Sequence, residues 1–489
     1  MPTKKKEKHI GQVFTPDFIV REMLDYTGYT AENDIIGKHV MENSCGDGAF
    51  LMQIVERYIQ AGMKNGCSDK EIRSGLETYI HGIDTDEAAI KNCLANLNGL
   101  AAKHNLHDVA WDIRLTDALS VSDYNGKMDY VIGNPPYVRV HNLDETYNEV
   151  KSFRFAEGGM TDLYLVFFEI GFRMLNETGR MCYITPSSWL HSVAATNMRS
   201  YIVQHENLIS LVDLGHFQPF GNITTYTLIS LFSKDTRSKE FDYYVFNGTT
   251  LTRDFITRLS YDDVLVDSCF YIAKRESLLT LKKVKAGNYR KCVSVKNGFA
   301  TLADKSFIGN DIPDTFITIP IVKGSTGKWT KGLFPYDKNG KPLPKKLIFS
   351  DPILSEHFNK EKDNLLKGKT EYDGWHLYGR TQALGDVWKN KIAINTLVRT
   401  AADLKIEQVN EGEGIYSGLY IIGDIDIDTA KELLMTEEFI DYVKCIKKYK
   451  SGGYYTFNSK DVEQFLNYKL KSRNHHGQPT VSQCHFQFV

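Results

Sequence analysis

The segment Asn134-Pro135-Pro136-Tyr137 has the residue types to hold a polar ligand in a fixed position. It directly follows an apolar strand pattern that ends at Gly133. Two consecutive prolines remove two backbone donors and fix φ twice, so the chain is rigid here and cannot continue a strand ladder. An ordinary strand-ending turn is the alternative, because Asn and Pro are common turn residues. A turn alone does not explain the adjacent ring of Tyr137, or the polar residues that end strands upstream.

Polar residues also follow three strands predicted earlier in the chain. Gly46 and Gly48 follow the first strand, where glycine lets the backbone approach a ligand closely. Asp84 ends the second strand, where a carboxylate can accept hydrogen bonds from a ribose diol, and Asp117 ends the third, where it can accept from an exocyclic amine. Each residue alone is as easily a turn or a solvated acid. Together they predict a nucleoside site, and the loop NSCGDG, which is neither GxGxxG nor GxxxxGK[ST], favours a nucleoside without a phosphate chain.

A regular fold must hold these residues in position. The first half of the chain predicts one, because strands alternate with helices along it. Strands are predicted at residues 39–42, 79–84, 109–115, 128–132, 180–184, 208–214 and 225–232. Helices are predicted at residues 18–26, with Thr15-Pro16-Asp17 as cap and first turn, from about Ala49 onward, at 87–97 and at 163–175. This alternation predicts an α/β fold with a mostly parallel sheet and helices on both faces. Ligands of such sheets bind outside the carboxyl ends of the strands, where every polar cluster lies.

Composition places the chain among ordinary globular proteins. Its 489 residues are 42% hydrophobic and 25% charged, a composition typical of two to four soluble domains. No run of about 18 apolar residues predicts a membrane span, and the basic N-terminus has no apolar region behind it that would indicate a secretory signal. The eight cysteines include no CxxC pair, which argues for reduced thiols and against a zinc site or a disulfide framework.

The charge is divided unequally along the chain. Residues 241–489 hold 36 Lys+Arg against 30 Asp+Glu, which leaves 23 against 31 for residues 1–240. Residues 271–350 alone carry 16 basic and 5 acidic residues, interleaved with aromatics. A charge run is usually a solvated face, but an excess of this size predicts a polyanion partner for the second half.

The order of the motifs resembles that of the γ-type, Taq-like adenine-N6 DNA methyltransferases of restriction-modification type. The segments that carry the resemblance are GQVFTP (11–16), MENSCGDGAF (41–50), GIDTD (82–86), LTDAL (115–119), GNPPYV (133–138), DLYLVFFEIGFRML (162–175) and GRMCYITPSSWL (179–190). The resemblance covers about residues 9–235. It implies a Rossmann-like S-adenosylmethionine-dependent methyltransferase domain at residues 1–240, followed by a mixed α+β target-recognition domain at residues 241–489.

The resemblance also implies the cofactor and its site. The cofactor would be S-adenosyl-L-methionine, with S-adenosyl-L-homocysteine as product and no metal, bound by Thr15, Pro16, Glu42, Gly46, Asp84, Asp117 and Pro135. Thr15 would contact the methionine end, Asp84 the ribose hydroxyls and Asp117 the adenine amine. The loop carries Asn43-Ser44-Cys45 where Pro-Ala-Cys or Pro-Ser-Cys is commoner, a departure that concerns only fine contacts.

Asn134, Pro135, Pro136 and Tyr137 would then be the catalytic residues. An exocyclic adenine amine is a poor nucleophile because its lone pair is delocalised into the ring. The side-chain oxygen of Asn134 and the carbonyl of Pro135 form an acceptor pair that can grip both N–H groups and favour the localised form. Attack on the methyl group is an in-line displacement that needs no metal and no covalent intermediate.

Tyr137 offers a face on which the target base can stack. A base inside a duplex must be flipped out to reach such a pocket, so a second aromatic wall is expected. Phe220 aligns with the stacking phenylalanine of the family, and Phe217 competes for that role.

From about Ser238 the alternation of strand and helix fades, and short patterned runs take over. Their resemblance to target-recognition domains is weaker. Lys296, Lys305, Arg380 and Arg399 are the candidates for DNA contact, because Arg and Lys suit guanine edges and phosphate. Taken singly, each is as easily a surface charge.

The expected partner is double-stranded DNA, in the cytoplasm of a prokaryote and at its nucleoid. No nuclease motif stands out, so any restriction endonuclease is expected to be a separate polypeptide; whether the protein is a monomer or a dimer stays open. A methyltransferase acting on RNA or on protein glutamine is the alternative, since NPPY serves those enzymes too. A catalytically inert DNA-binding protein is disfavoured by the intact Asn134-Pro135-Pro136-Tyr137 segment.

Overall fold

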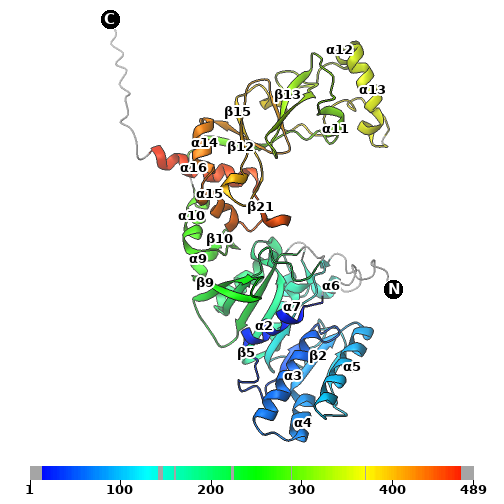
Figure 1. Ribbon diagram of the computed structural model, residues 1–489, viewed down its shortest axis with the longest axis vertical. Coiled ribbons are helices and arrows are strands. Elements are labelled where there is room, and N and C mark those ends of the chain that lie inside the picture. The colour runs from blue at the N-terminus through cyan, green and yellow to red at the C-terminus, as the bar shows by residue number, and fades with distance from the viewer. Residues whose placement is uncertain are drawn as a thin grey trace. The chain divides into compact units, whose positions relative to one another are not determined.

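The computed structural model describes residues 14–140, 147–158, 161–221, 225–287, 289–368 and 370–474. The chain divides into two compact units, residues 1–275 and 276–489 (Figure 1). The sequence suggested a domain boundary at residue 240, but the division lies further along the chain. The reason is that two strands, at Glu240–Asn247 and Thr252–Ser260, extend the sheet of the first unit. None of the helices in the described ranges is both long and apolar enough to cross a membrane.

Within its described residues, the first unit contains a nine-stranded sheet in the order β3-β2-β1-β4-β5-β7-β6-β8-β9. The strands are β1 (Val40–Glu42), β2 (Ile80–Asp84), β3 (Asp112–Leu115), β4 (Met128–Gly133), β5 (Leu175–Pro186), β6 (Leu208–Asp213), β7 (Thr227–Ser233), β8 (Glu240–Asn247) and β9 (Thr252–Ser260). The first five strands in this order, β3, β2, β1, β4 and β5, run parallel to one another. Strand β7 pairs antiparallel with both β5 and β6. The predicted mostly parallel, Rossmann-like sheet is confirmed.

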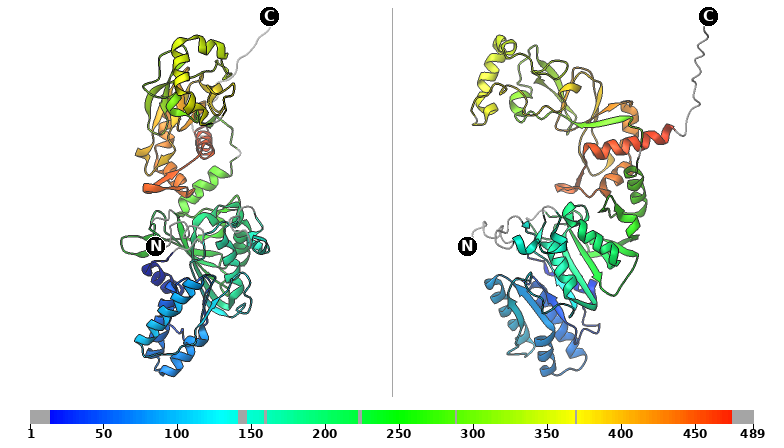
Figure 2. Two further views of the ribbon diagram at one scale, coloured as in Figure 1. Left: turned by 90° about the vertical axis from the view of Figure 1, so that its right-hand side faces the viewer. Right: turned by 180° about the vertical axis from the view of Figure 1, so that it is seen from behind.

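Helices cover both faces of this sheet (Figures 1 and 2). They are α2 (Asp17–Thr27), α3 (Ala49–Lys64), α4 (Asp69–Tyr79), α5 (Glu87–Lys103), α7 (Leu163–Met174) and α8 (Thr196–His205), with the single turns α6 (Tyr147–Val150) and α9 (Tyr261–Val264). Shorter 3-10 turns are η2 (Arg154–Ala156), η3 (Ser187–Leu190) and η4 (Val193–Ala195). Side chains alternate along β5, so Cys182 and Ile184 pack with α2 and α3, while Met181 and Tyr183 face Gly171 of α7.

Local sequence explains where several of these helices begin. Asp86 caps α5, since its side chain accepts hydrogen bonds from the backbone N–H groups of Ala88 and Ala89. Ser68 and Glu71 form a capping box at α4. The expected cap at α2 is different: Pro16 occupies the N-cap position without a side-chain bond, which leaves the Thr15 hydroxyl available for another partner.

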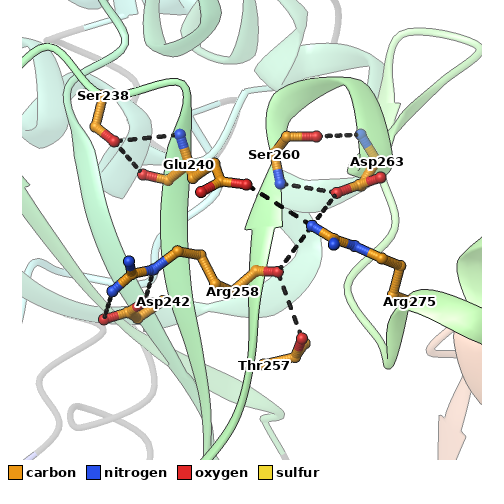
Figure 3. A network of polar contacts seen from close by, with 8 residues as sticks. All are labelled: Ser238, Glu240, Asp242, Thr257, Arg258, Ser260, Asp263 and Arg275. Carbon is orange, nitrogen blue, oxygen red and sulfur yellow. Dashed lines mark hydrogen bonds and ion pairs between the residues drawn. The ribbon is translucent and has the colours of Figure 1, made fainter.

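Strand β9 lies at the edge of the sheet, and its C-terminal half belongs to a network of polar contacts (Figure 3). Arg258 on β9 donates to Asp242 on β8 at 2.7 Å, and Arg275 donates to Asp263 at 3.1 Å. Ser260 and Asp263 form a capping box at α9. Charged, mutually bonded side chains on an edge strand discourage pairing with another chain, so this edge closes the unit. The hairpin β10 (Leu265–Val266) and β11 (Cys269–Phe270) follows it.

The second unit is a mixed α+β assembly, as predicted. Its described strands form the sheets β12-β19-β15-β17, β14-β13-β18 and β16-β21-β20. They are β12 (Val293–Asn297), β13 (Thr318–Lys323), β14 (Lys328–Leu333), β15 (Lys391–Ile394), β16 (Leu397–Val398), β17 (Ile406–Val409), β18 (Gly414–Tyr416), β19 (Leu419–Gly423), β20 (Tyr449–Lys450) and β21 (Tyr454–Thr456). The helices are α10 (Arg275–Lys285), α11 (Asp304–Phe307), α12 (Lys345–Ser350), α13 (Pro352–Leu366), α14 (Ile427–Leu434), α15 (Glu437–Cys445) and α16 (Ser459–Asn474), with the 3-10 turns η5 (Leu384–Asp386), η6 (Ala401–Asp403) and η7 (Ser451–Gly453).

Candidate active site

A cavity of about 460 Å³ lies at the carboxyl ends of β1 to β4. This is the edge at which ligands of α/β sheets bind, and the volume is in the range of small-molecule sites. The predicted residues that line it are Thr15, Glu42, Gly46, Asp84, Asp117, Asn134, Pro135 and Pro136. The structure therefore brings together seven predicted residues at the ends of separate strands and Thr15, which the sequence placed at the start of a helix.

The loop between β1 and α3 approaches the cavity closely because of its glycines. Gly46 and Gly48 have φ angles of 51° and 88°, the left-handed region that favours glycine. A Cβ atom on Gly48 would lie 2.7 Å from the Cys93 sulfur, so a larger residue there must displace the Cys93 side chain. The loop backbone is thus held against the cavity by both conformation and packing.

Asp84 fixes this loop from the neighbouring strand. Its Oδ2 accepts from the Gly46 N–H at 2.8 Å and its Oδ1 from the Asp86 N–H at 2.9 Å. A carboxylate has about four lone-pair positions, so two acceptor positions remain for a ligand's hydroxyls. Asp117 lines the same cavity from the end of β3, where the Leu119 N–H at 2.9 Å holds its Oδ1.

Glu42 is the most enclosed acid of the site, with 2% of its surface exposed. It accepts one backbone hydrogen bond, from Leu51 at 3.2 Å. Burial, together with the nearby Cys93, Asp84 and Asp47, raises the pKa of Glu42 well above its ordinary value. A cationic ligand in the cavity would oppose that shift and favour the carboxylate.

Charge in the lining is of one sign. Glu42, Asp47, Asp84 and Asp117 contribute carboxyl groups, and the described lining includes no lysine, arginine or histidine. Such a cavity suits a cationic nucleoside and opposes a phosphate chain. S-adenosylmethionine, which combines a nucleoside with a sulfonium and an ammonium group, fits these residues.

The amide of Asn134 is oriented by a contact that the sequence did not reveal. Its Nδ2 donates to the Thr15 hydroxyl oxygen at 3.0 Å, and its backbone carbonyl accepts from the Ser44 hydroxyl at 3.3 Å. With the nitrogen committed to Thr15, the amide oxygen takes the opposite side of the group. Thr15 is 8% exposed, so its hydroxyl is well placed to hold this orientation.

Tyr137 and Phe220 lie together, outside the lining of the cavity. The Tyr137 hydroxyl donates to the Ile184 carbonyl at 3.1 Å, and burial raises its pKa well above the ordinary value. The rings of Tyr137 and Phe220 meet edge to face, with centroids 6.2 Å apart and planes at 75°. A base stacked on Tyr137 must therefore use ring area that Phe220 does not cover, or displace Phe220. The competing Phe217 is partly buried and packs against Phe246, with ring centroids 5.0 Å apart, whereas Phe220 is 8% exposed and belongs to the buried core.

The remaining predicted residues have different surroundings. Pro16 begins α2, its carbonyl accepting from Ile19 at 2.9 Å, and it does not line the cavity. Residues 11–13 of the GQVFTP motif lie outside the described residues. The lining also contains residues that were not predicted as site residues, among them Phe14, Val138, Leu163 and Phe167. Phe14 is 65% exposed, and an aromatic directly before the Thr-Pro pair was the available signal.

The four candidate DNA contacts all belong to the second unit. Lys296 donates to Asp386 at 2.7 Å, and Arg399 pairs with Asp403 at 3.4 Å while stacking 4.4 Å over Tyr454. Lys305 and Arg380 are exposed. Lys296 and Arg399 therefore have partners within the protein.

The sheet topology is that of a Rossmann-like methyltransferase fold, and the residues of the cavity fit S-adenosylmethionine. Comparison with known families refines this class: residues 64–220 match the family described as Eco57I restriction-modification methylase. The chain is 22% identical, over 78% of its length and 48% of the relative's, to the type II restriction enzyme and methyltransferase RM.Eco57I of Escherichia coli. It is 27% identical, over 47% of its length and 43% of the relative's, to the type II methyltransferase M.BstVI of Geobacillus stearothermophilus.

A solved structure shares the fold over both units. The type IIL restriction-modification enzyme MmeI, solved in complex with DNA, matches 95% of this chain and 73% of its own, with a TM-score of 0.52 and 12% identity. The chain spans less than half the length of the two curated relatives. Together the matches support a methyltransferase of the restriction-modification type.

Proposed function

We propose that the protein is a site-specific DNA methyltransferase that transfers a methyl group from S-adenosylmethionine to N6 of an adenine flipped out of duplex DNA. The observation that carries this proposal is the position of Asn134 and Pro135 in the lining of the acidic cavity. Acceptors on a rigid turn thus adjoin the place where a cationic nucleoside would bind. The family match, the relatives and the basic stretch of the second unit support DNA as the substrate.

The chain's own residues divide the work. Asp84 and Asp117 would bind the nucleoside of the cofactor, and the carboxyl groups around it would stabilise its positive charge. When bound, the cofactor supplies an electrophilic methyl group. Asn134 Oδ1 and the Pro135 carbonyl accept hydrogen bonds from the two N–H groups of the target amine and localise its lone pair. Thr15 keeps the Asn134 amide in the required orientation.

The second unit would select the sequence to be methylated. Phosphate contacts supply affinity, whereas base-edge contacts supply specificity. We further propose that any restriction endonuclease that acts with this methyltransferase is a separate polypeptide.

Methyl transfer from tritiated S-adenosylmethionine to unmethylated genomic DNA, RNA and protein, measured side by side with the purified chain, tests the substrate class. We expect label in DNA alone. Single-molecule sequencing of the product should show N6-methyladenine in one sequence context. Label in RNA or in protein glutamine, without label in DNA, would replace the proposal with the alternative methyltransferase class.

A further inference from the structure

Leu302, in the loop between β12 and α11, is exposed in a backbone conformation that leucine rarely adopts. Its φ is 59°, in the left-handed region, and 54% of its surface is exposed. This conformation is unfavourable for a residue with a Cβ, and such strain persists only where surrounding contacts impose it. A large apolar side chain is thus presented to solvent at an energetic cost.

The surrounding contacts are specific and hold the loop in place. Thr301, 2% exposed, accepts from the Gly379 N–H at 2.8 Å through its carbonyl and from the Ala303 N–H at 3.1 Å through its hydroxyl. The Lys367 ammonium donates to the Leu302 carbonyl, and the Thr301 hydroxyl donates to Asp304. The strained residue therefore belongs to an ordered loop.

Gly379 brings a second loop directly beneath the Leu302 side chain. A Cβ atom on Gly379 would lie 2.5 Å from Leu302 Cδ1, so a larger residue there would force the leucine side chain to move. The next residue, Arg380, is exposed. The Leu302 side chain thus packs against the backbone at Gly379, and the rest of its surface is exposed to solvent.

Three cations belong to the segments that meet at Leu302: Lys305 follows it by three residues, Arg380 follows Gly379, and Lys367 bonds to the Leu302 carbonyl. Lys305, Lys367 and Arg380 are exposed, and within the described part of the chain none of them forms an ion pair. The nearest acid along the loop, Asp304, is engaged by Thr301. We call Leu302, Lys305, Lys367 and Arg380 the Leu302 tip.

We propose that the Leu302 tip contacts duplex DNA, with the leucine inserted at a base step and the cations bound to the flanking phosphates. A duplex offers this combination, because its apolar base-pair faces lie between two rows of negative charge. Leucine is among the side chains that partly unstack bases when they enter a groove. The inference rests on the proposed function, since it takes DNA as the substrate.

The test separates the apolar from the ionic contribution in the full chain. Binding to a fluorescent duplex that carries the methylated site, as read from sequencing, is measured across salt concentrations for Leu302→Ala and for Lys305→Gln with Arg380→Gln. Leu302→Ala should weaken binding by about tenfold without changing the salt slope, since no ion is released by an apolar contact. The double replacement should flatten the slope by up to about 0.9 for each phosphate that is no longer neutralised. Leu347→Ala, at a leucine 46% exposed on α12, is the matched control and should bind like wild type.

A glycine variant separates a role in binding from a role in folding. Because Gly adopts positive φ freely, Leu302→Gly should raise or preserve the unfolding temperature while weakening DNA binding. A glycine variant that unfolds earlier yet binds DNA normally would overturn the proposal and assign the leucine to stability. If all tip variants bind DNA like wild type but lose affinity for polyglutamate, the tip is a surface for acidic protein. Both outcomes leave the proposed function intact, whereas wild-type protein that neither binds nor methylates DNA would contradict the function itself.

Discussion

At the scale of single residues, the site depends on how an amide is oriented. An asparagine can present either its oxygen or its nitrogen to a ligand, and only the oxygen can accept from an adenine amine. Thr15 resolves this by accepting from Asn134 Nδ2 at 3.0 Å. We therefore propose that Thr15 is a positioning residue, in addition to the contact with the methionine end of the cofactor that the resemblance implies.

Removing that hydroxyl should slow methyl transfer without releasing the cofactor. In Thr15→Val the amide loses its fixed partner, so we expect kcat to fall by about tenfold, the cost of one neutral hydrogen bond, with the Kd of S-adenosylmethionine within twofold of wild type. Thr15→Ser should restore most of kcat because it keeps the oxygen. Weaker cofactor binding with normal single-turnover rates would return Thr15 to the cofactor role alone.

Removing the acceptor itself should be more severe. Asn134→Ala eliminates a preorganised polar contact to the target amine, and such losses typically cost 10²–10³ in rate. Cofactor binding, measured by calorimetry, should stay near normal. Asn65→Ala, at the exposed C-cap of α3, is the matched control. Retention of more than about a tenth of wild-type kcat by Asn134→Ala would remove this residue from the reaction.

Asp84 is expected to matter for binding more than for chemistry. Asp84→Ala removes the acceptor for a ribose and also releases the Gly46 N–H, which the carboxylate holds at 2.8 Å. We expect S-adenosylmethionine to bind about 1–3 kcal/mol more weakly. Asp123→Ala, which removes an exposed acid outside the cavity lining, serves as control. Unchanged affinity in calorimetry would exclude Asp84 from the site.

At the scale of elements, the sequence predicted those strands and helices that have a clear hydrophobic periodicity or that end in polar site residues. Strands β1, β2 and β4 and helices α5 and α7 were placed correctly, because buried parallel strands are short apolar runs and their ends carry the polar residues. Helix α4 was missed, since only Ile72, Gly75 and Leu76 are buried and most of its other residues are charged or polar. The antiparallel direction of β7 could not be predicted, because direction depends on pairing, which residue patterns do not encode.

The second unit was less predictable for a related reason. Its sheets join strands that are far apart in the chain: β12 pairs with β19, and β13 with β18. Many of its strands have two to six residues, too few for a clear alternation. Lys296 shows the consequence, because its partner Asp386 comes from η5, and no local pattern could reveal that ion pair.

Asp386 is expected to link the elements of this unit in a pH-dependent way. Burial opposes ionisation, but hydrogen bonds from Lys296, Lys389 and Tyr420 outweigh it and lower the pKa of Asp386 to about 2. An acid whose folded pKa is depressed contributes stability above its unfolded pKa of about 3.9, and that contribution is lost as pH falls toward 2. Asp386→Asn should therefore destabilise the unit at pH 7 by about 1–2 kcal/mol, allowing for solvent screening.

Amide hydrogen exchange at β15 and β19 measures this effect within the intact chain. The difference between wild type and Asp386→Asn should be largest near neutral pH and shrink steadily between about pH 4 and pH 2. Asp403→Asn, at a partly buried acid on η6 that pairs with Arg399, is the comparison and should change exchange at those strands little. A difference that is constant with pH would mean that Asp386 acts through packing instead of charge.

At the scale of the whole molecule, the two halves of the chain differ in charge, and this difference matches the proposed assignment of cofactor binding to one half and DNA binding to the other. Residues 1–240 hold 23 basic and 31 acidic residues, and the cavity in this half is lined by acids, so it attracts a cationic cofactor and repels a polyanion. The excess of 16 basic over 5 acidic residues falls at positions 271–350, almost all in the second unit. We therefore propose that affinity for DNA and affinity for the cofactor can be changed independently.

Replacing exposed lysines of that stretch tests the division directly. Lys328, Lys338, Lys341 and Lys346 are exposed, and glutamine in their place keeps length and polarity while removing charge. Duplex affinity should fall, and the slope of log affinity against log salt should flatten by up to about 0.9 for each lysine that contacts a phosphate. The Kd of S-adenosylmethionine should not change. Replacing Lys64 and Lys70 of the first unit, also exposed, should leave both affinities as they were, because these lysines lie in the acidic half. The opposite result would be a salt slope that is unchanged in the variant of the second unit and flattened in the Lys64 and Lys70 variant. In that case the first unit supplies the phosphate contacts, and the unequal charge of the two halves does not correspond to different functions.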